Sequence, residues 1–258
     1  MLPEDRSVDV PPPPTALTPP PSPAFHVLDA FAQGLRPTFR HPAAILGATL
    51  LSVTGLILVL AASLIPHAAW ITVPLLLLTA GPVWGPLSHL ALKSWRGQKP
   101  RVRDLFHEAR SSFRPLATTV AFLILLTSFA LIPGATLIVL GFQAGNHAQD
   151  LTPASATLLA SGLFLGPALA LIPAALYGFA PALVLDHHLP AAAALQLSRR
   201  TTLRQPFRNL LLAAACAILA TSGLLLAGFG LCFTLPWILG ARAHVHDRLF
   251  APAHAMAA

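Results

Sequence analysis

Long apolar runs alternate along the chain with short basic segments. Six stretches each approach or exceed the roughly 20 residues that carry an α-helix across a hydrocarbon core of about 30 Å. The expected spans lie at 43–65, 69–92, 116–141, 154–180, 210–227 and 231–246. Short connections join them in pairs, so the sequence predicts an all-α integral membrane bundle of six transmembrane helices arranged as three hairpins.

The last apolar run, 210–241, decides the number of spans. At about 1.5 Å per residue it would reach about 48 Å, too long for one crossing, and Gly228, Phe229 and Gly230 offer a turn inside it. Six spans place every Lys and Arg on one side, whereas five would leave Arg242 and Arg248 on the other. We therefore expect a multi-pass protein of a bacterial cytoplasmic membrane with both termini in the cytoplasm.

The segments outside the spans are short. Residues 1–24 are rich in proline and predict a disordered tail, with a docking ligand for a proline-reading domain as the alternative. Residues 25–41 predict an amphipathic helix at the membrane interface. The transmembrane domain is expected over 25–250, and 251–258 is a short C-terminal tail.

The distribution of charge adds the orientation of the predicted bundle in the membrane. The chain carries a net charge of +7, yet only 10% of its residues are charged and its mean hydropathy is +0.69. Because the basic residues flank apolar runs, we interpret them as contacts to anionic lipid headgroups and expect no nucleic-acid partner. The expected headgroup contacts are Arg36, Arg40, Lys93, Arg96, Arg114, Arg199, Arg200, Arg204 and Arg208.

Three segments share one order of residues. Each has arginine, an aromatic residue and proline, followed by an apolar run; these segments are 34–51, 110–126 and 200–219. The pattern predicts three copies of a unit made of an interfacial helix and a hairpin. The alternative is that any basic loop entering a span has this composition.

Candidate chemistry is sparse. No nucleophile elbow, phosphate loop or paired catalytic carboxylates occur, so we expect no enzyme and no cofactor. Asp104 and Glu108 are four residues apart and predict a helix that is ion-paired internally with nearby arginines. No charged residue is expected in the interior of a span, which argues against a proton-coupled pump.

Histidines and glycines each suggest one further feature. His187, His188, His244 and His246 close two expected spans and could supply ligands to a metal, although their spacing matches no compact zinc motif. Glycines at 81 and 85 and at 162 and 166 have the small-xxx-small spacing that lets helices pack closely. Packing within the chain is the expectation for these glycines, and a homo-oligomer interface is the alternative.

Several local patterns resemble a group of bacterial polytopic membrane proteins. They include Gly81-Pro82 through Gly85, the segment Tyr177 to Asp186, and the closing His244 to Phe250. Over about residues 30–250 these patterns are similar to the YciC-type inner-membrane proteins and to the membrane-anchor domain of some glycerophosphodiester phosphodiesterases. The resemblance implies about six spans and no established catalytic residues.

The combined expectation is a non-catalytic membrane protein that acts as a scaffold or organises lipid and the cell envelope. Its expected partner is the bilayer with anionic headgroups at the cytoplasmic face. The alternatives are a permease for a neutral or hydrophobic solute and, from the histidines alone, a metal-binding membrane protein. A polar cavity near the midplane, lined by groups such as Thr54, Thr127 or Ser161, would favour the permease.

Overall fold

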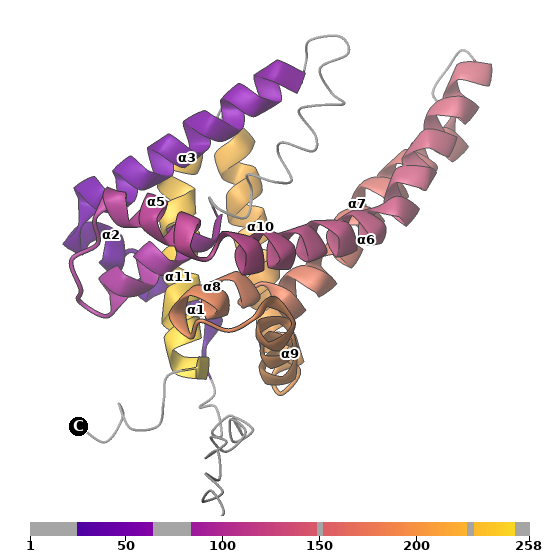
Figure 1. Ribbon diagram of the computed structural model, residues 1–258. Coiled ribbons are helices and arrows are strands. Elements are labelled where there is room, and N and C mark those ends of the chain that lie inside the picture. The colour runs from indigo at the N-terminus through magenta and orange to yellow at the C-terminus, as the bar shows by residue number, and fades with distance from the viewer. Residues whose placement is uncertain (1–24, 64–83, 149–151, 226–229, 251–258) are drawn as a thin grey trace, which may run out of the picture.

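The computed structural model describes residues 25–63, 84–148, 152–225 and 230–250, and all the regular secondary structure in these ranges is helical (Figure 1). The all-α prediction is therefore confirmed for the described part of the chain. The expected tails 1–24 and 251–258 lie outside these ranges, as do residues 69–83 of the expected second span.

The helices follow one another with short connections. In chain order they are α1 Val27–Gly34, α2 Arg36–Arg40, α3 Pro42–Ser63, a helix over 84–95, α5 Val102–Ser111, α6 Phe113–Ala148, α7 Pro153–Tyr177, α8 Ala180–Asp186, α9 Ala191–Thr202, α10 Pro206–Leu225 and α11 Leu231–Phe250. Proline opens several of them at the first helical turn, where its missing N–H costs no hydrogen bond. Thr152 caps α7, since its Oγ1 accepts from the backbone N–H of Ser155 at 3.2 Å.

Three helical segments of the described residues are long and apolar enough to cross a membrane: Phe113–Gly145, Pro153–Asp186 and Pro206–Leu225. The six-span count and the layout in three hairpins are thus not supported by this part of the chain. The described apolar part of α3 is shorter, at Pro42–Gly55. In α11 the polar residues of its C-terminal half lower the hydropathy, and the helix is largely enclosed by protein.

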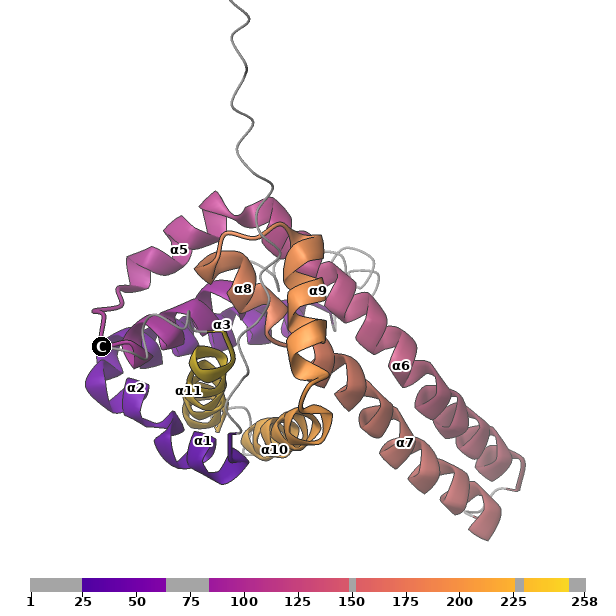
Figure 2. The same ribbon diagram turned by 90° about the horizontal axis from the view of Figure 1, so that it is seen from below.

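Helix α11 occupies the centre of the main helical body. Figure 2 shows it nearly end-on, with α1, α3, α8 and α10 around it. Its buried face includes Ala241 and Val245 in one apolar cluster and Leu235 and Leu239 in another, so a single helix joins the two cores. This central position explains why polar side chains of α11 are enclosed by protein.

The helix expected over 25–41 packs against α11, and its position at the membrane interface stays a prediction. It is divided into α1 and α2, and the indole Nε1 of Trp237 donates to the carbonyl of Phe31 at 2.7 Å. Phe25 is fully buried whereas Leu28 is 84% exposed, so only part of the expected apolar face is covered. The cause is the close approach of α1 to α11, where a Cβ on Gly34 would lie 2.9 Å from the backbone N of Ala241.

Helices α6 and α7 form an antiparallel hairpin that extends away from the rest of the helices (Figures 1 and 2). Its seam is glycine-lined: a Cβ on Gly134 would lie 2.5 Å from Gly166 Cα, and one on Gly162 would lie 2.6 Å from the Gly134 carbonyl oxygen. The expected packing role of Gly162 and Gly166 within the chain is therefore confirmed. Gly81 lies outside the described residues, and a Cβ on Gly85 would meet the side chain of Leu116.

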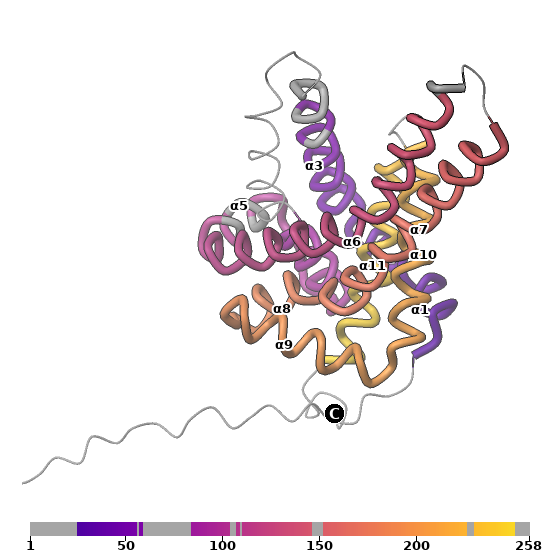
Figure 3. The backbone as a smooth tube through the Cα atoms, turned by 90° about the vertical axis from the view of Figure 1, so that its right-hand side faces the viewer, coloured from indigo at the N-terminus to yellow at the C-terminus, as the bar shows by residue number. Residues whose placement is uncertain are grey.

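The three segments with the shared arginine–proline order all lie at one kind of junction. Each leads from a short helix into a long one: from α2 into α3, from α5 into α6 and from α9 into α10. In Figure 3 the far ends of α3 and of the α6–α7 hairpin point away from α8 and α9. Common origin of the three units stays a prediction, because a shared junction alone does not distinguish a repeat from a recurrent way of entering a span.

Candidate functional site

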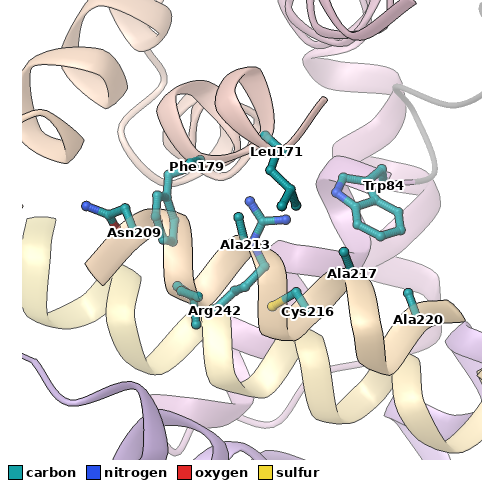
Figure 4. A pocket seen from close by; sticks show the side chains of 12 residues that line it. Trp84, Leu171, Phe179, Asn209, Ala213, Cys216, Ala217, Ala220 and Arg242 are labelled. Atoms are coloured by element: carbon teal, nitrogen blue, oxygen red, sulfur yellow. The ribbon is translucent and has the colours of Figure 1, made fainter. Parts of the chain in front are cut away.

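A pocket of about 200 Å³ lies where α7, α10 and α11 meet, with Trp84 of the helix 84–95 at one end (Figure 4). Its walls are mainly alanine and leucine. Two polar side chains line it as well, Asn209 at the start of α10 and Arg242 from α11.

One face of α10 forms a wall of this pocket. Residues 209, 212, 213, 216, 217 and 220 follow the three- and four-residue spacing that places side chains on one side of a helix. The alanines at 213, 217 and 220 extend only to Cβ, so they leave space that larger side chains would fill. The free thiol of Cys216 lies in the same row.

Arg242 supplies the positive charge of the pocket. Its Cζ lies 5.4 Å from the centre of the Phe179 ring, a cation–π distance. A Cβ on Gly178 would clash with Arg242 Nη2, so glycine at the end of α7 permits this approach. The guanidinium thus lies beside the C-terminus of α7, the negative end of the helix dipole.

The charge of Arg242 has no carboxylate partner in this site. Arg242 makes no hydrogen bond or ion pair with any residue that the structure describes, although a guanidinium carries five N–H donors. Arg242 is half-buried, and a cation without an opposite charge is unfavourable there, because one cation–π contact offsets only part of the lost hydration. The pocket is therefore electrostatically arranged to accept an anion.

Asn209 places an unused acceptor in the same pocket. Its amide nitrogen donates to the carbonyls of Thr202 and Gln205, both at 3.0 Å, which fixes the orientation of the amide. The residue is 2% exposed, and its Oδ1 has no hydrogen-bond partner among the described residues. The amide oxygen of Asn209 is therefore buried at the edge of the pocket without a hydrogen-bond partner among the described residues.

Two ion-pair clusters hold the helices near this site. Arg96 donates to both carboxylate oxygens of Asp186, at 2.6 and 3.0 Å, and to Asp247 at 2.9 Å, so it ties the helix 84–95 to the ends of α8 and α11. Burial alone would lower the pKa of Arg96, but these two carboxylates outweigh it and hold that pKa above its usual value.

The second cluster corrects the expectation for Glu108, whereas the side chain of Asp104 lies outside what the structure describes. Glu108 contacts His89 Nδ1 at 2.6 Å and accepts from Lys93 Nζ, so it pairs across to the helix 84–95 rather than within its own helix. Burial alone would raise the pKa of Glu108, but its hydrogen bonds with His89 and Lys93 hold that pKa below its usual value. The pairing follows from the position of α5 over the helix 84–95.

The histidines do not converge in the way that a shared metal site requires. His187 and His188 are exposed, whereas His244 and His246 are buried in α11. His244 packs edge-on against Trp95 at 4.7 Å, and the ring of His246 lies 6.5 Å from that of His187. Among the described residues, no group of three or more His, Cys, Asp or Glu is placed to hold a metal ion.

The residues expected to contact headgroups fall into two sets. Lys93 and Arg96 belong to the clusters above, whereas exposed or half-buried side chains occur at Arg36, Arg40, Arg114, Arg199, Arg200, Arg204 and Arg208. Exposed aromatic residues lie among them in the sequence: Phe39 is 78% exposed and Phe207 80% exposed. This mixture of basic and aromatic side chains is typical of the membrane–water interface.

Comparison with known proteins adds no assignment, since no family model, curated protein or solved structure matches this chain. The resemblance to the YciC-type group stays a prediction.

The sequence did not indicate Arg242 as a site residue, because its charge placed it with Arg248 at a membrane surface. The available signal was its place within the expected last span, 231–246, directly after the apolar run that ends at residue 241.

Proposed function

We propose that this chain is a non-catalytic multi-pass membrane protein that binds and organises lipid. The finer form of the proposal is six spans in a bacterial cytoplasmic membrane, with both termini in the cytoplasm and anionic headgroups at the basic face. Its support is the three long apolar helices together with the one-sided distribution of Lys and Arg in the sequence.

The observation that carries the proposal is the exposure of large apolar side chains along the candidate spans. Leu125 and Phe129 of α6 are 70% and 72% exposed, Phe164 of α7 is 76% exposed and Ile218 of α10 is 72% exposed. A water-facing protein seldom exposes so extensive an apolar surface, whereas lipid chains cover such a surface at no cost in hydration. The exposed arginines and phenylalanines near the ends of these helices would then contact headgroups.

The headgroup proposal is tested by the lipids that remain bound to the full chain. The protein is reconstituted in an equal mixture of phosphatidylcholine and phosphatidylglycerol, extracted, and its bound lipids are quantified by mass spectrometry. We expect enrichment of phosphatidylglycerol that falls in the double variant Arg199→Gln/Arg200→Gln. The matched control, Arg103→Gln/Arg110→Gln, removes the same charge from exposed positions of α5 and should keep the enrichment. Equal lipid compositions in all three proteins would contradict specific headgroup contact.

The topology is tested separately with reporters fused to each terminus. Six spans place both termini on the cytoplasmic side, so both reporters should give the cytoplasmic signal. Termini on opposite sides would refute the even number of spans and with it the cytoplasmic placement of Arg242 and Arg248.

The permease alternative has one observation in its favour, the pocket beside α10. The polar residues expected to line a solute path do not line this pocket: Thr54 and Ser161 are exposed on the outer surface. The pocket is also smaller than the 300–1,000 Å³ of typical small-molecule sites. These features favour lipid binding over passage of a solute. Protein-dependent release of a neutral or hydrophobic solute from vesicles would support the permease instead.

A further inference from the structure

We propose that the pocket between α7, α10 and α11 binds the anionic head of a membrane amphiphile, a carboxylate or a phosphate, on the guanidinium of Arg242. The first part of the amphiphile's alkyl chain packs along the alanine-rich face of α10. This inference rests on the proposed function, because it assigns a particular lipid-binding site to a protein proposed to organise lipid.

The positive charge of Arg242 favours an anion in this pocket. The guanidinium of Arg242 lies over the ring of Phe179 and against the end of α7, but none of its N–H groups donates to a described residue. Carboxylate and phosphate match the planar fork of a guanidinium with two parallel hydrogen bonds. In a pocket with apolar walls such a pair is screened far less than at a surface, so an anion gains most by binding here.

The shape and the apolar chemistry of the pocket walls favour an alkyl chain attached to that anion. From Asn209 to Ala220 the pocket follows one face of α10 over about 16 Å, at about 1.5 Å per residue. Figure 4 shows Arg242 directed between this face and Leu171 of α7. A small inorganic anion would satisfy the charge but would leave the apolar walls uncovered. An amphiphile satisfies both features with one molecule.

The volume of the pocket limits how much of the amphiphile it can hold. About 200 Å³ is below the range of pockets that enclose a whole drug-sized ligand. The pocket therefore takes a head and the beginning of one chain, and the rest of the chain continues into the bilayer.

The native thiol of Cys216 gives a direct readout, because it lines the same pocket. The full chain carries two cysteines, so Cys232→Ala leaves Cys216 as the single target for N-ethylmaleimide. The protein is placed in phosphatidylcholine nanodiscs, and the labelling rate is measured with added oleate, with phosphatidic acid, or with oleyl alcohol as the neutral counterpart of oleate. We expect oleate or phosphatidic acid to slow labelling at concentrations at which oleyl alcohol has little effect.

The source of the head follows from which anion protects the thiol. Protection by oleate alone assigns a free fatty acid, and protection by phosphatidic acid assigns a phospholipid head. Equal protection by oleyl alcohol would overturn recognition of the charge. The absence of protection by every amphiphile would overturn the site itself.

Variants on α11 test the role of the guanidinium. Arg242→Gln should raise the concentration needed for half-protection by about ten- to a hundredfold, and Arg242→Lys should raise it less. Arg248→Gln removes the same charge from the same helix outside the pocket and should leave protection unchanged. Unchanged protection in Arg242→Gln would overturn the proposal. If that variant does not fold, the proposal is still tested by comparing oleate with oleyl alcohol on the protein that keeps Arg242.

The two proposals fail in different ways. Loss of phosphatidylglycerol enrichment with intact protection of Cys216 would remove the headgroup contacts at the basic face and leave the pocket. Intact enrichment without protection would remove the pocket and leave the general lipid-organising function.

Discussion

The glycine seam of the α6–α7 hairpin predicts that two alanine substitutions four residues apart have opposite consequences. In Gly162→Ala the new Cβ would lie 2.6 Å from the Gly134 carbonyl oxygen and 3.0 Å from the backbone N of Ile138. In Gly166→Ala the nearest atom, Gly134 Cα, would be 3.5 Å away, which is ordinary van der Waals contact. The two glycines share one sequence motif, but only one of them is required by the packing.

The magnitude follows from these contacts. Relief of the Gly162→Ala clash requires the 2.6 Å contact to lengthen by about 0.8 Å, to the 3.4 Å of ordinary contact. Both partners are backbone atoms, so no flexible side chain can move aside. Overpacking of this kind costs about 1–3 kcal/mol, and a gap of that size along the seam also weakens dispersion contacts. Alanine favours helix over glycine by about 1 kcal/mol at both positions, so this contribution cancels when the variants are compared.

We therefore expect Gly162→Ala to be less stable than Gly166→Ala by about 1–3 kcal/mol, with Gly166→Ala equal to or slightly more stable than the parent. The free energy of unfolding is measured in mixed micelles by titration with sodium dodecyl sulfate, followed by circular dichroism. Equal stabilities, or a greater loss in Gly166→Ala, would show that the hairpin does not pack through this seam.

Two further predictions concern the ion-pair clusters. Because the pKa of Glu108 is lowered in the folded state, its contribution to stability is present above the unfolded pKa of about 4.3 and is lost as the pH falls through the folded value. Glu108→Gln should flatten that acid limb in unfolding measured from pH 7 to pH 3, and an unchanged slope would contradict the pairing. Arg96→Gln should cost about 2 kcal/mol, because it leaves the carboxylate of Asp186, whose side chain is 7% exposed, without its bidentate partner. Its effect should appear in the free energy of unfolding, and a change only in bound lipid would instead indicate a headgroup contact.

The sequence predicted the helices more fully than it predicted the candidate site. The ends of α6, α7 and α10 follow from apolar runs bounded by proline and basic residues, and the structure places helices there. These features are local, so they can be recognised from consecutive residues. The helix at 25–41 was expected from its amphipathic pattern, but the same pattern serves equally for a membrane interface and for packing against α11.

The partners of Glu108 and Arg96 could not be predicted from sequence. The sequence predicted that Glu108 pairs with a nearby arginine, yet Glu108 pairs with Lys93 of another helix. Likewise Arg96 meets Asp186 and Asp247, which are 90 and 151 residues away along the chain. Such pairs depend on which helix ends lie side by side in the fold. Because several helix ends have similar composition, the sequence does not identify the partner of each charged residue.

The sequence by itself determined that the described ranges are helical and that several of their helices suit a membrane, because hydropathy and the scarcity of charge are properties of composition and order. Only the tertiary structure decided that α11 is the central helix and that Arg242 faces a pocket. Two separate segments create that environment: the turn after α7 brings Phe179 and leaves space for the guanidinium at Gly178, and α10 brings its alanine face. Whether a charge has a partner depends on its surroundings, and these surroundings form only when the helices pack together.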